Sequence, residues 1–211
     1  MNVLALDTAT PSPSVCLLAR GDLFEEGLSS DRRASEELLP AVRRVLGAAG
    51  VRLEDCDRIA VCAGPGSFTG VRVGMATAWG LGRALGIPVE AVSTLEALAE
   101  SARGRADSRV VAALDAGRGD LVCETFVLDP GRARSLGPPR LVRRSEAADL
   151  PEDGAVTTVP DGLAGWPATP GGQSAAAALA RAVARAPRPV GSVLTAIYSR
   201  PSAAEEKRGA P

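Results

Sequence analysis

Short apolar runs alternate with turn-forming residues through the first thirty positions of the chain. The runs cover residues 3–7, 15–19 and 23–28, and the sequences Thr-Pro-Ser-Pro and Arg-Gly-Asp separate them. Apolar runs between such residues are typical of consecutive strands joined by tight turns. We therefore expect the chain to begin with an antiparallel meander.

The pattern changes to a helical period over residues 34–49. Apolar residues recur there every three or four positions, at Leu38, Leu39, Val42, Val45 and Leu46. Charged residues occupy the opposite face, and Gly50 follows where a helix would stop. This pattern predicts an amphipathic helix.

The segment that follows alternates strands with helices. We expect a strand at 58–63, a helix at 69–85 and a strand at 89–92. A further helix should reach residue 102, with Ser93 and Glu96 as a capping box that satisfies two backbone N–H groups. The first half thus reads βββαβαβα.

The second half is less regular. Residues 110–114 and 121–128 read as strands around a glycine turn. Weaker patterns predict a strand at 140–143, a short helix at 145–150, a strand at 156–159 and an Ala-rich helix at 174–185. We therefore expect an α/β protein of two subdomains, residues 1–102 and a reduced 103–201, with a mobile tail at 202–211.

Composition and charge narrow the class of protein. Hydrophobic residues make up 45% of the chain and charged residues 23%, as in an ordinary globular protein. Lys plus Arg number 24 against 25 for Asp plus Glu, which leaves no positive field for strong nucleic-acid binding. Arg32, Arg33, Arg43 and Arg44 form a local basic patch or, for the last two, the solvated face of a helix.

The start of the chain and its apolar runs bear on location. No uninterrupted apolar stretch approaches the roughly 20 residues that span a bilayer. Asp7 lies where a signal peptide would have its apolar region. The sequence therefore predicts a cytoplasmic protein.

Histidine and cysteine usage removes many kinds of chemistry. The chain has no histidine, the usual general base and the commonest metal ligand. Its four cysteines show no Cys-x-x-Cys pair, and three of them fall within apolar runs. We expect buried thiols, no metal site and no cofactor.

Two turns carry the polar residues that could face a nucleotide. Asp7 and Thr8 end the first strand, an arrangement that resembles the phosphate-facing hairpin of the actin, hexokinase and Hsp70 fold. Asp115 ends a strand at the start of the second half. Asp and Thr are also ordinary turn formers, so a structural role is the alternative interpretation.

A glycine-rich run joins the predicted strand 58–63 to the helix that follows it. Residues 64–74 read Gly-Pro-Gly-Ser-Phe-Thr-Gly-Val-Arg-Val-Gly and match neither the P-loop nor the dinucleotide fingerprint. Gly70, Gly74 and Ala78 are four residues apart and share one helix face. Two glycines inside a helix cost about 1 kcal/mol each, so we expect this face to contact another helix closely.

Taken together, these motifs resemble the TsaB family. The resemblance rests on the run 64–74, on Leu-Ala-Leu-Asp-Thr at 4–8, on Ser-Glu-Glu-Leu-Leu-Pro at 35–40 and on Ser-Thr-Leu-Glu-Ala-Leu-Ala at 93–99, in the family's order and spacing. Later matches are Asp-Ala-Gly-Arg-Gly-Asp at 115–120 and the Tyr-x-Arg ending at Arg200. Many members keep a histidine where this chain has Ala34.

The resemblance implies a fold, a role and partners. It implies the actin/hexokinase/Hsp70-like fold and a non-catalytic subunit of the complex that forms threonylcarbamoyladenosine in tRNA. TsaD would be its partner in a heterodimer, TsaE would join the assembly, and tRNA would be reached only through the complex. Alone, the chain could form a homodimer. Gly70, Gly74 and Ala78 form a stripe of small residues, and the amphipathic helix at 34–49 is expected to lie next to it. We therefore expect the interface with the partner to include Leu38, Leu39, Val42, Gly70, Gly74 and Ala78.

Three alternatives belong to other classes. A small kinase of the same fold would need a full second domain, for which the remaining chain is short. A metallopeptidase would need metal ligands, which a chain without histidine supplies poorly. A nucleotide-binding regulator would use Asp7, Thr8 and Asp115 as a weakened site.

Overall fold

The computed structural model describes residues 1–29, 34–104, 109–149, 156–158, 173–189 and 195–198. Its first sheet has the strand order β3-β2-β1-β4-β5. The strands are β1 (Val3–Asp7), β2 (Ser14–Ala19), β3 (Asp22–Gly27), β4 (Arg58–Cys62) and β5 (Val89–Val92). The first three strands pair antiparallel and β4 and β5 continue in parallel with β1, which confirms the predicted meander.

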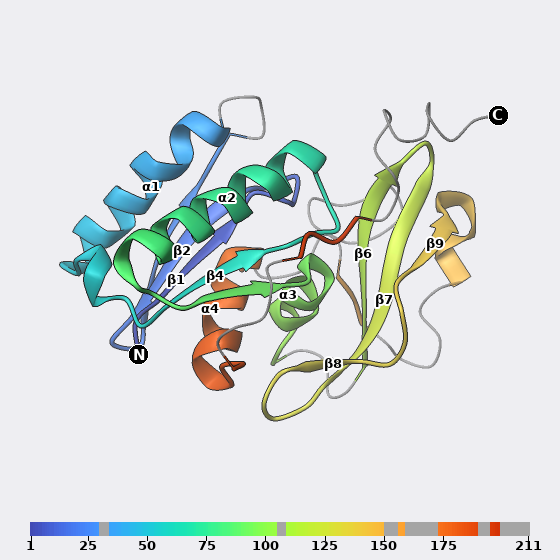
Figure 1. Cartoon of the computed structure of the whole chain (residues 1–211). Helices are drawn as coiled ribbons and strands as arrows, with labels where there is room; N and C mark the ends of the chain where they lie inside the picture. The colour runs from blue at the N-terminus through green and yellow to red at the C-terminus, as the bar shows by residue number, and fades with distance from the viewer. Residues whose placement is uncertain (30–33, 105–108, 150–155, 159–172, 190–194, 199–211) are drawn as a thin grey trace.

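Helices cover both faces of this sheet (Figure 1). One face packs against α1 (Ala34–Ala49) and α2 (Phe68–Leu85), with a single turn η1 (Leu53–Asp55) between α1 and β4. Alternate residues of β1 separate into the two cores: Leu4 and Leu6 face α1 and α2, whereas Val3 and Ala5 join the core on the other face. The helix at 34–49 has the predicted bounds.

The second sheet has the order β10-β6-β7-β8, and β9 also pairs with β7. Its strands are β6 (Arg109–Gly117), β7 (Asp120–Leu128), β8 (Ala133–Ser135), β9 (Arg140–Arg143) and β10 (Val156–Thr158). The sequence pattern missed β8, which has three residues and therefore shows no period. The short helix expected at 145–150 is the 3-10 helix η2 (Arg144–Asp149).

Two helices join the sheets into one core. α3 (Thr94–Ser101) packs against β6 and β7 of the second sheet, and α4 (Ala175–Arg185) packs against α3 and against β1, β2 and β4. The alanine side chains of α4 let its backbone lie close to the first sheet, where Leu179 and Val183 are fully buried. The predicted boundary at residue 102 stays a prediction, and the tail at 202–211 lies outside the described residues.

The helix ends differ in part from the sequence expectation. Ser67 is the N-cap of α2, and its hydroxyl accepts a hydrogen bond from the Gly70 N–H at 3.2 Å. The capping box at Ser93 is wrong, because that side chain makes no cap hydrogen bond. The Glu96 carboxylate accepts hydrogen bonds from Arg132 and Arg188 instead.

No helix in the described ranges combines the length and the apolar character that crossing a bilayer requires.

Candidate functional site

The Asp7 carboxylate, which was expected to face a nucleotide, makes its hydrogen bonds within the turn after β1. The Asp7 carboxylate is fully buried, and it accepts hydrogen bonds from the N–H groups of Ala9 at 2.9 Å and Thr10 at 3.2 Å. The Thr10 hydroxyl also donates to it. Burial raises the pKa of Asp7, although these hydrogen bonds act in the opposite direction. Asp7 therefore holds the turn together.

Thr8 and the glycine-rich loop complete this internal packing. The Thr8 hydroxyl donates to the carbonyl oxygen of Gly70 at 2.6 Å. The Ser67 N–H donates to the carbonyl of Ala9 at 2.8 Å. A Cβ atom on Gly66 would lie 2.2 Å from that same carbonyl oxygen, so only glycine fits there. The loop thus packs against the turn after β1.

The small stripe of α2 lies inside the chain. A Cβ atom on Gly70 would be 1.8 Å from the carbonyl oxygen of Thr8, and one on Gly74 would be 2.4 Å from the Thr8 hydroxyl oxygen. Gly74 and Ala78 are buried against the first sheet. The close contact that the sequence predicted is real, but it is made with the turn after β1 and with the sheet rather than with another helix.

This burial revises the expected partner interface. Leu38 and Val42 of α1 are also buried in the core between α1, α2 and the first sheet. Like Gly74 and Ala78, they offer no surface to a partner in this conformation. Gly70 is half-buried beneath Thr8, whereas Leu39 is 46% exposed.

Asp115 lies in a different environment from Asp7. It is exposed near the β6–β7 hairpin, where its carboxylate accepts a hydrogen bond from the Gly117 N–H at 2.7 Å. Its other oxygen pairs with the Arg144 guanidinium at 2.6 Å. Within the part of the chain that the structure describes, Asp7, Thr8 and Asp115 share no hydrogen-bond or ion-pair partner.

The exposed face of α2 carries large side chains that the sequence reasoning missed. Trp79 is 59% exposed, and Phe68 and Arg72 precede it on the same face of α2. The Arg72 guanidinium lies 3.7 Å from the centroid of the Phe68 ring and donates to the Tyr198 hydroxyl at 3.3 Å. Large apolar residues at exposed positions of a helical period were the available signal.

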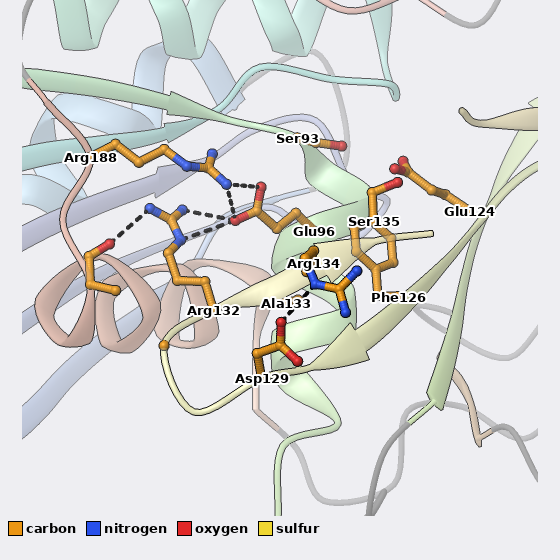
Figure 2. A pocket seen from close by; sticks show the side chains of 12 residues that line it. Ser93, Glu96, Glu124, Phe126, Asp129, Arg132, Ala133, Arg134, Ser135 and Arg188 are labelled. Atoms are coloured by element: carbon orange, nitrogen blue, oxygen red, sulfur yellow. Dashed lines mark hydrogen bonds and ion pairs between the residues drawn. The ribbon is translucent and has the colours of Figure 1, made fainter. Parts of the chain in front are cut away.

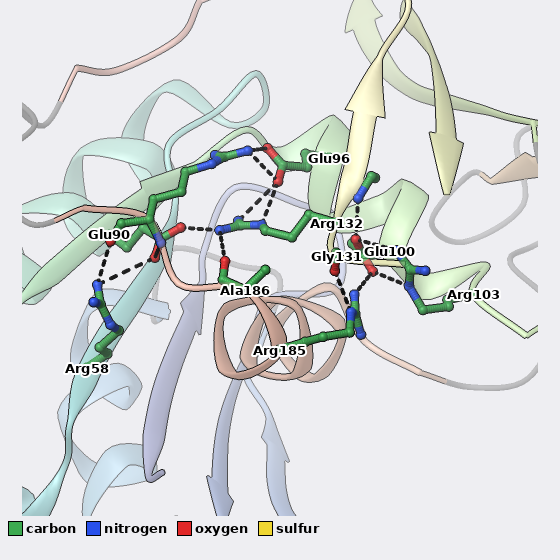
Figure 3. A network of polar contacts seen from close by, with 11 residues as sticks. Arg58, Glu90, Glu96, Glu100, Arg103, Gly131, Arg132, Arg185 and Ala186 are labelled. Atoms are coloured by element: carbon green, nitrogen blue, oxygen red, sulfur yellow. Dashed lines mark hydrogen bonds and ion pairs between the residues drawn. The ribbon is translucent and has the colours of Figure 1, made fainter. Parts of the chain in front are cut away.

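A buried ionic network is the second feature that local pattern did not reveal (Figure 3). Arg132, which precedes β8, pairs with Glu90 of β5 and with Glu96 of α3. Glu100, one turn further along α3, pairs with Arg103 at 2.8 Å and with Arg185 of α4 at 2.6 Å. The network connects both sheets with α3 and α4.

The thiols and carboxylates are the side chains that could act as metal ligands or nucleophiles in a chain without histidine. All four cysteines are buried, and burial raises the pKa of Cys16 to about 12 and those of Cys56 and Cys123 to about 11. Burial also raises the pKa of Cys62 well above its usual value. Protonated thiols are poor ligands and nucleophiles. Within the residues that the structure describes, no three Cys, Asp or Glu side chains form a group that could hold a metal ion.

The strand order and the positions of the helices define the structural class of this protein. A meander followed by two parallel strands, with helices on both faces and a second small sheet, is the mixed α/β architecture of the actin/hexokinase/Hsp70 fold. Comparisons with known proteins then identify the group within this class. A family model described as "TsaD: tRNA N6-adenosine threonylcarbamoyltransferase" matches residues 28–160. The structure of YeaZ from Pseudomonas aeruginosa superposes with a TM-score of 0.66 at 38% identity, over 75% of this chain and 74% of that one.

Sequence relatives agree with the structural match. The protein named tRNA threonylcarbamoyladenosine biosynthesis protein TsaB from Escherichia coli is 39% identical over 61% of this chain and 56% of its own length. The protein of the same name from Bacillus subtilis is 32% identical over 71% of this chain and 66% of its own length. The chain belongs to the TsaB family. It spans about half the length of relatives such as the E. coli protein, at 56%.

Proposed function

We propose that this chain is a non-catalytic subunit of the assembly that forms threonylcarbamoyladenosine in tRNA. Membership of the TsaB family supports the pathway, because the E. coli and B. subtilis relatives are named for that biosynthesis. The match to the TsaD family model supports a common architecture with the transferase. A cytoplasmic location follows from this role.

The proposed partner is a TsaD protein, with TsaE joining the assembled complex. In the absence of TsaD, the surface of this chain that binds TsaD forms a homodimer instead. Contact with tRNA is made through the complex, and the chain needs no cofactor of its own. The nearly balanced charge, 24 basic against 25 acidic residues, supports an indirect contact with tRNA.

One observation carries the proposed interaction: the outer face of α1 and α2 exposes Trp79, Phe68, Arg72 and Leu39. Tryptophan and arginine are the residues that most often dominate the energy of protein interfaces. A tryptophan that is 59% exposed is costly to leave in water and gains most by burial against a partner. The proposed interface therefore consists of exposed residues that lie next to the stripe formed by Gly70, Gly74 and Ala78.

A non-catalytic role is supported by the state of the polar residues. Asp7 and Thr8 are engaged in the turn after β1 and in α2, so neither is directed at a substrate. Burial keeps the four thiols protonated near neutral pH. These observations favour a subunit that binds rather than reacts.

The test is a binding measurement with TsaD from the same organism. We expect co-purification of the wild-type chain, and at least about tenfold weaker binding for Trp79→Glu and for Leu39→Glu, since a buried charge replaces an apolar contact. Leu141→Glu is the matched control. Leu141 is 46% exposed, as Leu39 is, but it lies on β9 at the far side of the molecule (Figure 1).

Two outcomes would contradict the proposal. Normal binding by Trp79→Glu would remove α2 from the interface. Turnover of ATP, or transfer of the threonylcarbamoyl group, by the pure chain alone would show that it is an enzyme, provided that Asp7→Asn or Asp115→Asn abolished that activity.

A further inference from the structure

A cavity of about 560 Å³ lies between the start of α3 and the strands β7 and β8. Its lining includes Ser93 and Glu96 from the first half of the chain, and Glu124, Phe126 and Ser135 from the second (Figure 2). It is large enough for a small organic molecule, and it combines a buried aromatic ring with charged groups, as ligand pockets do.

Most of the charges that line the cavity are already paired. Glu96 accepts from Arg188 at 2.8 Å and from Arg132 at 3.0 Å. The Arg134 guanidinium pairs with Asp129 at 2.8 Å. Figure 2 shows both sets of contacts within the cavity wall.

Glu124 differs from the other lining carboxylates. It is half-buried on β7, and no cation of the described residues pairs with it. Burial raises the pKa of Glu124, the nearby Glu96 charge raises it further, and a hydrogen bond from Ser135 offsets this only in part. A half-buried carboxylate without a counter-ion is unfavourable, and a cationic ligand would remove that cost.

Phe126 adds an apolar contact next to this carboxylate. It follows Glu124 by two residues on β7, so both side chains lie on the face of the strand that borders the cavity. A carboxylate beside an aromatic ring is suited to an alkylammonium group, which pairs with the first and packs on the second.

We propose that this cavity binds a small ligand with a primary ammonium group, for which Glu124 supplies the counter-ion. The Phe126 ring contacts the alkyl part of the ligand, and the Ser93 and Ser135 hydroxyls border its polar end. This site is separate from the α1 and α2 surface, so it stands or falls independently of the function proposed above.

The experiment uses the full chain and n-butylammonium, followed by two-dimensional NMR of the backbone amides. We expect saturable shifts confined to residues 93–97 and 124–135. Neutral 1-pentanol and anionic butyrate, which have similar size, should bind at least about tenfold more weakly. Glu124→Gln, which keeps the shape but removes the charge, should weaken n-butylammonium binding by a similar factor.

Glu25→Gln is the control, because it makes the same chemical change at an exposed carboxylate of β3, which does not line the cavity. It should leave binding within about twofold of wild type. A thermal melt checks that Glu124→Gln is folded, and we expect it to be at least as stable as wild type near neutral pH. Equal binding of n-butylammonium and 1-pentanol, or unchanged binding in folded Glu124→Gln, would overturn the proposal.

Discussion

At the scale of single residues, Asp7 lies where the actin, hexokinase and Hsp70 fold has its phosphate-facing hairpin, but here its hydrogen bonds stabilise the turn after β1. It lies at the end of β1 and beside the buried thiol of Cys62, and its Oδ1 atom accepts hydrogen bonds from two N–H groups of the turn that leads into β2. Its burial raises its pKa, so the folded state binds a proton at Asp7 more tightly than the unfolded chain does.

The first prediction concerns the pH dependence that follows. Stability contributed by the Asp7 proton is fully present below the usual aspartate pKa near 4 and is lost as pH rises through the raised folded pKa. Asp7→Asn removes this loss, so its free energy of unfolding should gain on that of wild type as pH increases. Urea unfolding from pH 4 to 8 measures the difference.

Asp7→Ala provides the companion variant. It leaves the N–H groups of Ala9 and Thr10 without their acceptor, which costs about 1 to 3 kcal/mol. A pH-independent difference between wild type and Asp7→Asn would mean that burial does not disfavour the charge at this position.

At the scale of secondary-structure elements, α2 carries three glycines on the face that packs against the first sheet and the turn after β1. Gly70 and Gly74 lie under Thr8, and Gly82 lies under Val89, where a Cβ atom would be 2.2 Å from a Val89 methyl carbon. The helix can therefore approach β1, β4 and β5 closely. Gly80 lies on the opposite, exposed face, where a Cβ atom would have no neighbour within 4 Å.

The second prediction uses this contrast within one helix. Gly74→Leu should destabilise the monomer by roughly 1 to 3 kcal/mol, because the side chain must displace Thr8 and Val61. Gly80→Leu should stabilise it by up to about 0.8 kcal/mol, since leucine is the better helix former. Thermal or urea unfolding of both variants should give opposite signs. A stable, well-folded Gly74→Leu would show that the stripe is not packed as described.

At the scale of the whole molecule, the buried ionic network joins parts that lie far apart in the chain. Arg132 follows Glu96 by 36 positions and Glu90 by 42, and all three side chains are buried. Burial alone would raise the pKa of Glu100, but hydrogen bonds from Arg103 and Ala133 hold it below its usual value. The network fixes how α3 and α4 sit between the sheets.

The third prediction compares two arginines that are two residues apart. Arg132→Ala leaves Glu90 and Glu96 buried with fewer counter-ions, and it should cost roughly 3 to 5 kcal/mol of unfolding free energy. Arg134→Ala breaks an exposed pair with Asp129 and should cost about 0 to 1 kcal/mol. Similar losses for both variants in urea unfolding would contradict the special role of the buried arginine.

Much of the architecture was readable from local pattern. The meander, the bounds of α1 and the order of strands and helices up to α3 follow from apolar periods and turn residues, which act over a few positions. The stripe of α2 was also visible as a close contact, because glycines inside a helix need an offsetting interaction.

Only the tertiary structure decided what each of these features touches. The stripe faces Thr8 and Val61, and Glu96 binds Arg132 rather than capping its own helix. The orientation of α2 about its own axis that buries Gly74 also leaves Trp79 exposed. The same physical reason explains all three cases. The period of apolar residues depends only on neighbouring positions in the chain, whereas a buried contact depends on which distant residue the fold brings next to a given side chain.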